Sequence, residues 1–156
     1  MKKSQKIIIL IVVLCVICAF GSFLMNSINS YTRVLKTNWG IELPKAGAKE
    51  IFAYSEPSFH GDGIRYHVID YPIGNESKRM QNSVFQLDKI FLHSPQPTEE
   101  QIRYVEQLLE QIDVKEDVIP DWGKCELVYL KQEDSSELFL FYWSGTGTVY
   151  IVESFL

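Results

Sequence analysis

An uninterrupted apolar segment near the N-terminus constrains this chain more than any other feature. Residues 7–25 contain no charged side chain, and Lys2, Lys3 and Lys6 precede them. The segment of about 19 residues approaches the ~20 that an α-helix needs to cross the ~30 Å hydrocarbon core of a bilayer. Because basic flanks stay on the cytoplasmic side, we expect residues 1–6 to be cytoplasmic, residues 7–25 to form a single-pass transmembrane helix, and the remainder to lie outside.

Two other interpretations of this segment remain open. A cleaved secretory signal has the same basic start and apolar centre, and Ala19-Phe20-Gly21 offers a small-x-small cleavage site. The protein would then be secreted. A lipoprotein signal is disfavoured, because Cys15 and Cys18 each follow a large aliphatic residue where a small one is usual. The apolar residues that continue beyond residue 21 favour an uncleaved anchor in the cell membrane, and all three interpretations place the domain outside.

The rest of the chain is acidic and has room for one domain. The whole chain carries a formal charge of −5, and the first 25 residues carry three lysines and no acid, so the remainder carries −8. An acidic domain repels phosphate backbones, which argues against nucleic acid as a partner. The length of 156 residues suits a single domain beside the anchor. Cys125 is the one cysteine after the apolar segment, so an internal disulfide is not available there.

The first part of the external region predicts a linker and then a β-hairpin. Residues 26–42 are expected to be a juxtamembrane helix extension and linker, and residues 43–156 to form the domain. Residues 49–56 and 64–71 are rich in β-formers and alternate in polarity. Asp62-Gly63 between the two segments is typical of a hairpin turn.

Two helices are predicted next. Residues 75–91 place apolar side chains at helical spacing, with Asn75 as the N-cap. In residues 98–112, Thr98 and Gln101 form a capping-box pattern. An apolar stripe follows on one face of this second helix: Ile102, Val105, Leu108, Leu109 and Ile112.

Three strands complete the predicted fold. Residues 126–131, 137–143 and 149–155 are joined by short polar or glycine-containing turns, which favours an antiparallel meander. The middle strand is apolar on both faces, as expected of a central strand that is covered on both sides. The order strand–strand–helix–helix–strand–strand–strand predicts an α+β fold, with an antiparallel sheet and both helices on one face.

Two short patterns carry a resemblance. One is Pro57-Ser58-Phe59-His60-Gly61-Asp62-Gly63 before an aromatic strand, and the other is the terminal hairpin with residues 139–142 and 149–153. Together they resemble small, uncharacterised, membrane-anchored or secreted proteins of Gram-positive bacteria. The resemblance implies a location at the cell surface and implies no activity.

One polar cluster near the first hairpin contains residue types that bind zinc. It contains His60, Asp62, His67 and Asp70. Zinc ligands must converge, but His67 lies roughly 10–13 Å along the strand from the turn, and alternation sends His67 and Asp70 to opposite faces. We therefore predict no metal, cofactor or catalytic residue here. We expect Phe59, His60 and Asp62 at the hairpin tip to contact a partner.

Two functional hypotheses follow from the sequence. The first is a non-catalytic, membrane-tethered binding module, such as an immunity or inhibitor protein, whose partner is another protein or a peptide. The alternative is an enzyme with an unrecognised site around the first hairpin. The sequence has no evident convergence of titratable groups, which favours the binding module.

Overall fold

The computed structural model describes residues 5, 31–45, 47–55, 62–75, 78, 92–94 and 96–156. The transmembrane helix predicted over 7–25 and most of the helix predicted over 75–91 lie outside these residues, as do Phe59 and His60. Within the described ranges, no helix combines the length and the apolar character that a membrane crossing requires.

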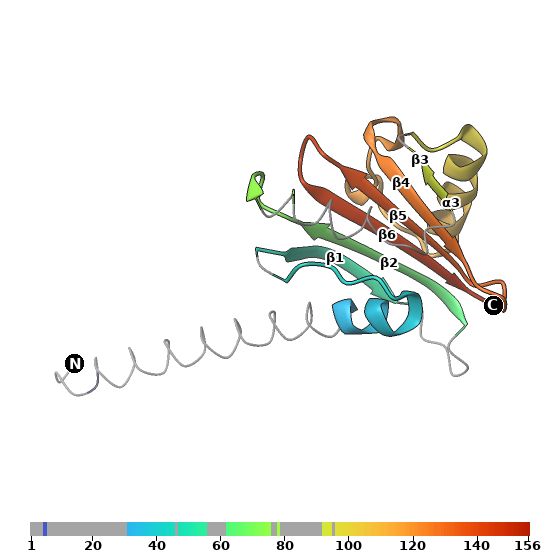
Figure 1. Ribbon diagram of the computed structural model, residues 1–156, viewed down its shortest axis with the longest axis horizontal. Coiled ribbons are helices and arrows are strands. Elements are labelled where there is room, and N and C mark those ends of the chain that lie inside the picture. Colours follow the sequence, from blue (N-terminus) through green and yellow to red (C-terminus); the bar gives the residue numbers. More distant parts are fainter. Residues whose placement is uncertain are drawn as a thin grey trace.

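A six-stranded antiparallel sheet forms the centre of the fold (Figure 1). Its strands are β1 (Lys49–Ser55), β2 (Gly63–Asp70), β3 (Leu92–Ser94), β4 (Glu126–Lys131), β5 (Glu137–Trp143) and β6 (Thr148–Phe155). Their spatial order is β1-β2-β6-β5-β4-β3, so β6, the last strand of the meander, lies beside β2 of the first hairpin. The predicted α+β class and antiparallel pairing are confirmed, and β3 is an additional edge strand.

The predicted first hairpin is confirmed. Strands β1 and β2 pair from Lys49 opposite Asp70 to Ser55 opposite Arg65, with a register shift between residues 50 and 52. Gly63 begins β2 at a φ of +120°, a conformation that side chains with a Cβ rarely adopt. The Asp62-Gly63 signal therefore identified a position that requires glycine.

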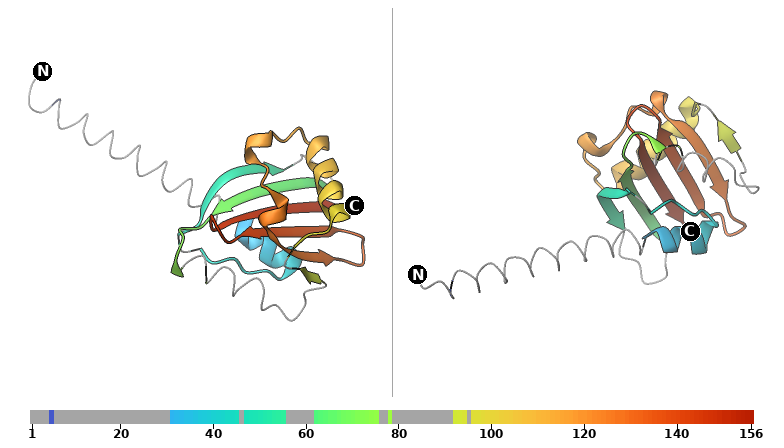
Figure 2. Two further views of the ribbon diagram at one scale, coloured as in Figure 1. Left: turned by 90° about the horizontal axis from the view of Figure 1, so that it is seen from above. Right: turned by 60° about the vertical axis from the view of Figure 1, so that its left-hand side comes forward.

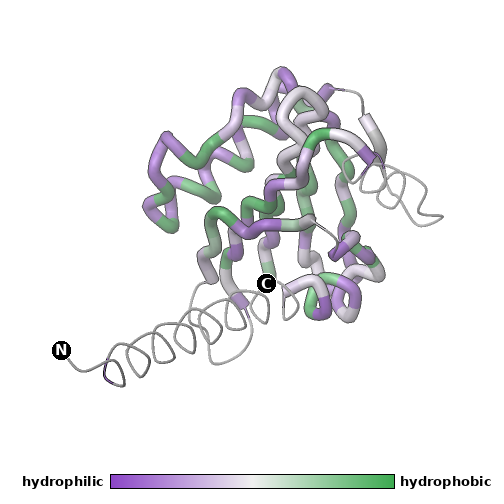
Figure 3. Tube along the Cα trace, turned by 90° about the vertical axis from the view of Figure 1, so that its left-hand side faces the viewer, coloured by the Kyte–Doolittle hydropathy of each residue, from purple (hydrophilic) through white to green (hydrophobic). Residues whose placement is uncertain are grey.

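The helix α3 (Glu99–Gln111) also follows its sequence signals. The Thr98 hydroxyl accepts a hydrogen bond from the Gln101 backbone N–H at 3.2 Å, and the Thr98 N–H donates to the Gln101 side chain at 2.9 Å. Both bonds satisfy groups that a helix start would otherwise leave unpaired. Val105, Leu108 and Leu109 are buried on the predicted stripe, and apolar and polar positions alternate along the helix in Figure 3.

Residues 31–39 form a helix, within the segment 26–42 that was expected to be a juxtamembrane helix extension and linker. Tyr31, Leu35 and Trp39 recur at every fourth position and are buried. They pack on the face of the sheet opposite α3, together with sheet residues such as Ile69 and Leu140 (Figure 2). Helix 31–39 therefore covers the second face of the sheet, because a sheet that is apolar on both faces needs a cover on each.

The sheet thus has α3 against one face and helix 31–39 against the other. The expectation that the helices predicted over 75–91 and 98–112 share one face stays a prediction, because most of residues 75–91 lie outside the described residues. The α3 face holds a core of Val105, Leu109, Trp122 and Phe141, among others. Trp122 lies in the short 3₁₀ helix Trp122–Lys124, and its ring centroid is 4.5 Å from that of Phe141. Trp122 therefore packs into the core just before β4, the first strand of the meander.

Candidate functional site

A polar groove lies between helix 31–39 and the first hairpin. It encloses about 480 Å³ and is lined by Tyr31, Val34, Glu50, Ala53, Ser55, Arg65 and His67. The alternation of β1 and β2 produces this lining, because every second side chain points to the face that helix 31–39 covers. Arg65 and His67 point to this face, while Tyr66 and Val68 enter the core on the α3 side.

A fully buried carboxylate lies beneath the groove. Glu153 is in β6, is 0% exposed, and pairs in register with Arg65 of β2. Its carboxylate accepts a hydrogen bond from Trp39 Nε1 at 2.6 Å and one from the Tyr31 hydroxyl at 3.2 Å. A buried carboxylate is costly unless such donors surround it. The two donors explain why helix 31–39 docks at this position on the sheet.

Tyr31 connects this carboxylate to a second polar pair. Its ring stacks on the His67 imidazole, with 3.4 Å between centroids and 14° between planes. His67 Nδ1 lies 2.7 Å from Glu50 Oε1, and both side chains are largely buried. Burial raises the pKa of the Tyr31 hydroxyl well above its usual value, and the charge and hydrogen bond of Glu153 add to that shift. Tyr31 is therefore a neutral donor in this site.

Arg65 is the cation of the groove, and part of its hydrogen-bonding capacity is unused. The guanidinium carbon lies 4.5 Å from the centroid of the Phe155 ring. Its Nη1 atom is buried and has no hydrogen-bond partner among the described residues. Buried donors are nearly always satisfied, so an unsatisfied guanidinium nitrogen beside a groove calls for an explanation. A carboxylate or phosphate oxygen from a ligand would satisfy it.

The groove has some components of a catalytic site. A histidine paired with a carboxylate can act as a general base when a nucleophile lies within hydrogen-bond reach. Within the described part of the chain, the hydrogen bond recorded for His67 joins it to Glu50. The Cys125 thiol lies in the core on the other face, where burial, with a smaller contribution from Asp121, raises its pKa to about 12. Cys125 is thus protonated and unsuited to nucleophilic attack.

The tip residues predicted to contact a partner are only partly described. Phe59 and His60 lie outside the described residues, so their role stays a prediction. Asp62 is exposed and lines a separate hollow of about 370 Å³ that Arg65 and Phe155 also border. Arg65 therefore lies between the groove and the tip side of the hairpin.

The other members of the polar cluster near the first hairpin have separate partners. His67 pairs with Glu50, whereas Asp70 accepts a hydrogen bond from the Thr148 hydroxyl at 2.7 Å. In the described ranges, no three His, Cys, Asp or Glu side chains gather as a metal site would require.

Sequence reasoning missed most of the groove. Tyr31, Trp39, Glu50, Arg65 and Glu153 were not predicted as site residues. Two signals were available: the every-fourth-residue spacing of Tyr31, Leu35 and Trp39, and a lone acid within the otherwise apolar strand at 149–155. Neither signal identifies its partner, because Trp39 and Glu153 are 114 positions apart.

Comparison with known proteins gives no match: no protein-family model fits the chain, and no curated protein or solved structure is similar to it.

Proposed function

We propose that this protein is a non-catalytic binding module, tethered to the outer face of the membrane, that holds a segment of a partner protein or peptide in the groove beside β1. The observation that carries the proposal is Arg65, whose side chain lines the groove and whose Nη1 has no hydrogen-bond partner within the described residues. A partner that presents an acidic group would supply the missing acceptor.

The position of β1 supports binding of an extended segment. It is the last strand on its side of the described sheet, and its residues Ile51, Ala53 and Ser55 are exposed. A peptide can add a strand to such an edge through main-chain hydrogen bonds, while side-chain pockets provide specificity. The register shift between residues 50 and 52 would confine this pairing to the regular part of β1, from Phe52 to Ser55.

The tether would keep the groove close to the membrane. Tyr31 borders the groove and follows the apolar segment 7–25 by six positions, which an extended chain spans in about 20 Å. Partners at the membrane surface would then meet the groove at high effective concentration. A membrane protein with an acidic external segment is the partner class that fits best.

Site-specific photo-crosslinking tests the proposal. A photoreactive amino acid replaces Ala53 in the groove of the full chain in intact cells, and a control carries it at Glu106 on the exposed face of α3. We expect one discrete adduct from position 53 and none from position 106. Arg65→Gln should abolish the adduct, whereas Lys45→Gln, at an exposed residue outside the groove lining, should leave it unchanged.

Two results would contradict the proposal. Equal crosslinking from positions 53 and 106 would show that partners contact the domain at random and not specifically at the groove. An adduct that survives Arg65→Gln, with the fold intact by circular dichroism, would remove Arg65 from recognition.

The His67–Glu50 pair keeps the enzyme alternative testable, because it lies in the same groove as the Ser55 side chain. A fluorophosphonate probe labels serine nucleophiles that an adjacent base activates. For a binding module we expect no labelled peptide from the full chain. Labelling at Ser55 that His67→Gln abolishes would support the enzyme instead.

A further inference from the structure

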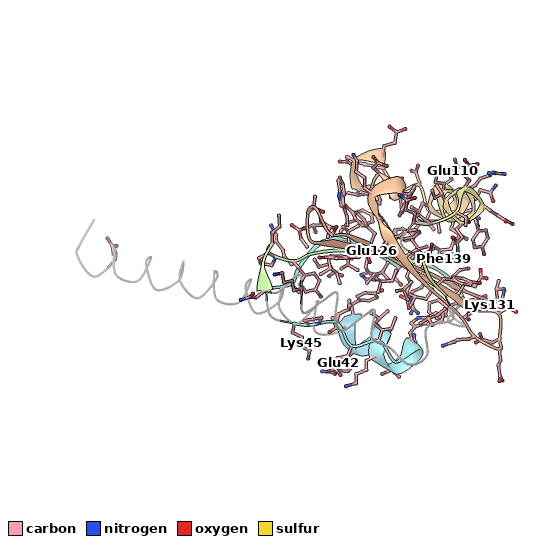
Figure 4. All side chains as sticks on the ribbon, turned by 45° about the horizontal axis from the view of Figure 1, so that its top comes forward. Glu42, Lys45, Glu110, Glu126, Lys131 and Phe139 are labelled. Carbon is pink, nitrogen blue, oxygen red and sulfur yellow. The ribbon has the colours of Figure 1, made fainter. Side chains whose placement is uncertain are left out.

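A second cavity lies on the other face of the sheet, under the first turns of α3. It encloses about 320 Å³ and is lined by Glu100, Gln101, Tyr104, Tyr129, Glu137 and Phe139. This volume is at the small end of the range for ligand pockets in proteins. Figure 4 shows Phe139 on the α3 side of the sheet, whereas Glu42 and Lys45 lie on the side of helix 31–39.

Three aromatic rings from three elements meet in this cavity. Phe139 of β5 is 3% exposed and lies opposite Tyr129 of β4 in register, with ring centroids 4.8 Å apart. Tyr104 of α3 approaches Phe139 from the other side, at 5.7 Å between centroids, and is 38% exposed. The Phe139 ring is inclined by 38° to the Tyr129 ring and by 55° to the Tyr104 ring, so the three rings do not form a flat stack.

One carboxylate holds Tyr129 in place. Glu137 accepts a hydrogen bond from the Tyr129 hydroxyl at 2.6 Å. Lys131 Nζ also donates to it, at 2.9 Å. Burial alone would raise the pKa of Glu137, but these hydrogen bonds hold it below its usual value. Glu137 therefore stays ionised, and the Tyr129 ring is fixed before any ligand arrives.

The charge and chemistry of this cavity favour one class of ligand. Glu100 is exposed at the rim, one helical turn before Tyr104, and Lys131 neutralises only Glu137. Aromatic faces and carboxylates attract cations, and an aromatic cage is the usual recognition site for alkylated ammonium groups. A metal ion would need several lone-pair ligands, and the described residues contain no group of three His, Cys, Asp or Glu side chains that could supply them.

We infer that the cavity formed by Tyr104, Tyr129 and Phe139 binds an organic cation, namely a small alkylammonium group. The rings contact the alkyl groups, and the Glu100 carboxylate, which Lys131 does not neutralise, balances the charge. This site is separate from the groove at Arg65, which lies on the opposite face of the sheet and favours an anionic group. Failure of one proposal therefore leaves the other intact.

A matched pair of probes tests the inference on the full chain in dodecyl maltoside micelles. Choline carries the cation, and 3,3-dimethylbutan-1-ol is its neutral isostere. With ring-labelled tyrosine, we expect choline to shift the NMR signals of Tyr104 and Tyr129 saturably, with a Kd on the order of millimolar. The neutral alcohol should give at least about fivefold weaker binding, since it lacks the cation–π and charge terms.

Variants locate the site. Tyr104→Leu removes an exposed wall of the cavity and should weaken choline binding at least about fivefold. Glu100→Gln should weaken it by a smaller factor and leave the fold unchanged, which keeps the test valid if Tyr104→Leu folds poorly. Glu106→Gln, on the exposed face of the same helix, should leave the affinity unchanged.

Three outcomes would overturn the inference. The first is an absence of saturable shifts at choline concentrations on the order of 0.1 M. The second is equal binding of choline and its neutral isostere. The third is an affinity that neither Tyr104→Leu nor Glu100→Gln alters.

Discussion

The hydrogen bond between Trp39 and Glu153 offers the sharpest test of how helix 31–39 is attached. Trp39→Phe keeps an aromatic ring at a position that is 8% exposed and removes the N–H that donates to Glu153 at 2.6 Å. A hydrogen bond to a charged group contributes about 1.5–3 kcal/mol, and the smaller ring loses some packing against the sheet. We therefore expect the free energy of unfolding to fall by about 2–4 kcal/mol.

An exposed ion pair of nearly the same length is the matched control. Lys36 Nζ lies 2.7 Å from Glu42 Oε2, but both side chains are more than half exposed, at 58% and 70%. Water and salt screen such a pair, so Glu42→Gln should change the free energy of unfolding by less than about 1 kcal/mol. The two contacts differ little in distance, so the difference between the two changes in the free energy of unfolding reports the effect of burial.

Urea unfolding of the full chain in a non-ionic detergent, followed by circular dichroism, gives both values. The slope with denaturant should stay constant, so that a shifted midpoint reports stability. A double-mutant cycle of Trp39→Phe with Glu153→Gln should show coupling, because the two residues share one bond. If Trp39→Phe and Glu42→Gln cost the same within about 0.5 kcal/mol, Glu153 does not anchor helix 31–39.

Four further predictions follow. Leu109→Ala should cost about 2–5 kcal/mol in urea unfolding and Glu106→Ala less than about 0.5, and equal midpoints would mean that the buried face of α3 is misplaced. Gly63→Val should destabilise by more than about 1 kcal/mol, since valine is strained at the φ of +120°, and an unchanged melting temperature would contradict this. The thiol of Cys125, with its pKa raised to about 12, should resist iodoacetamide at pH 8 until the protein unfolds, as peptide mapping would reveal. External protease should digest the domain in intact protoplasts while residues 7–25 stay with alkali-washed membranes, whereas a soluble chain that begins near residue 22 would indicate a cleaved signal.

Local sequence was enough to predict several elements because their causes are local. The Thr98–Gln101 capping box is formed by residues three positions apart, and Gly63 meets a steric demand of its own backbone. The stripe on α3 follows from a period of 3.6 residues, and the meander from short turns between apolar strands. Each of these signals involves neighbours along the chain.

The order of the strands was decided by tertiary structure. Alternating polarity reports which side chains share a face, but it carries no information on which strand lies beside which. β6 pairs with both β2 and β5, so it joins the first hairpin to the meander. For the same reason, the sequence did not predict that helix 31–39 covers the second face of the sheet. Residues 31–39 have a stripe of three large side chains, yet only the uncovered face of the sheet gives that stripe a partner.

The candidate groove depends on tertiary structure still more. The sequence by itself was enough to predict an acidic α+β domain after an apolar segment, a capped helix and a first hairpin with glycine at position 63. Only the folded chain brought Glu153 beneath Tyr31 and Trp39, across separations of 122 and 114 residues. A buried charge gains its donors from whatever packs against it, and that packing is a property of the whole sheet rather than of any segment.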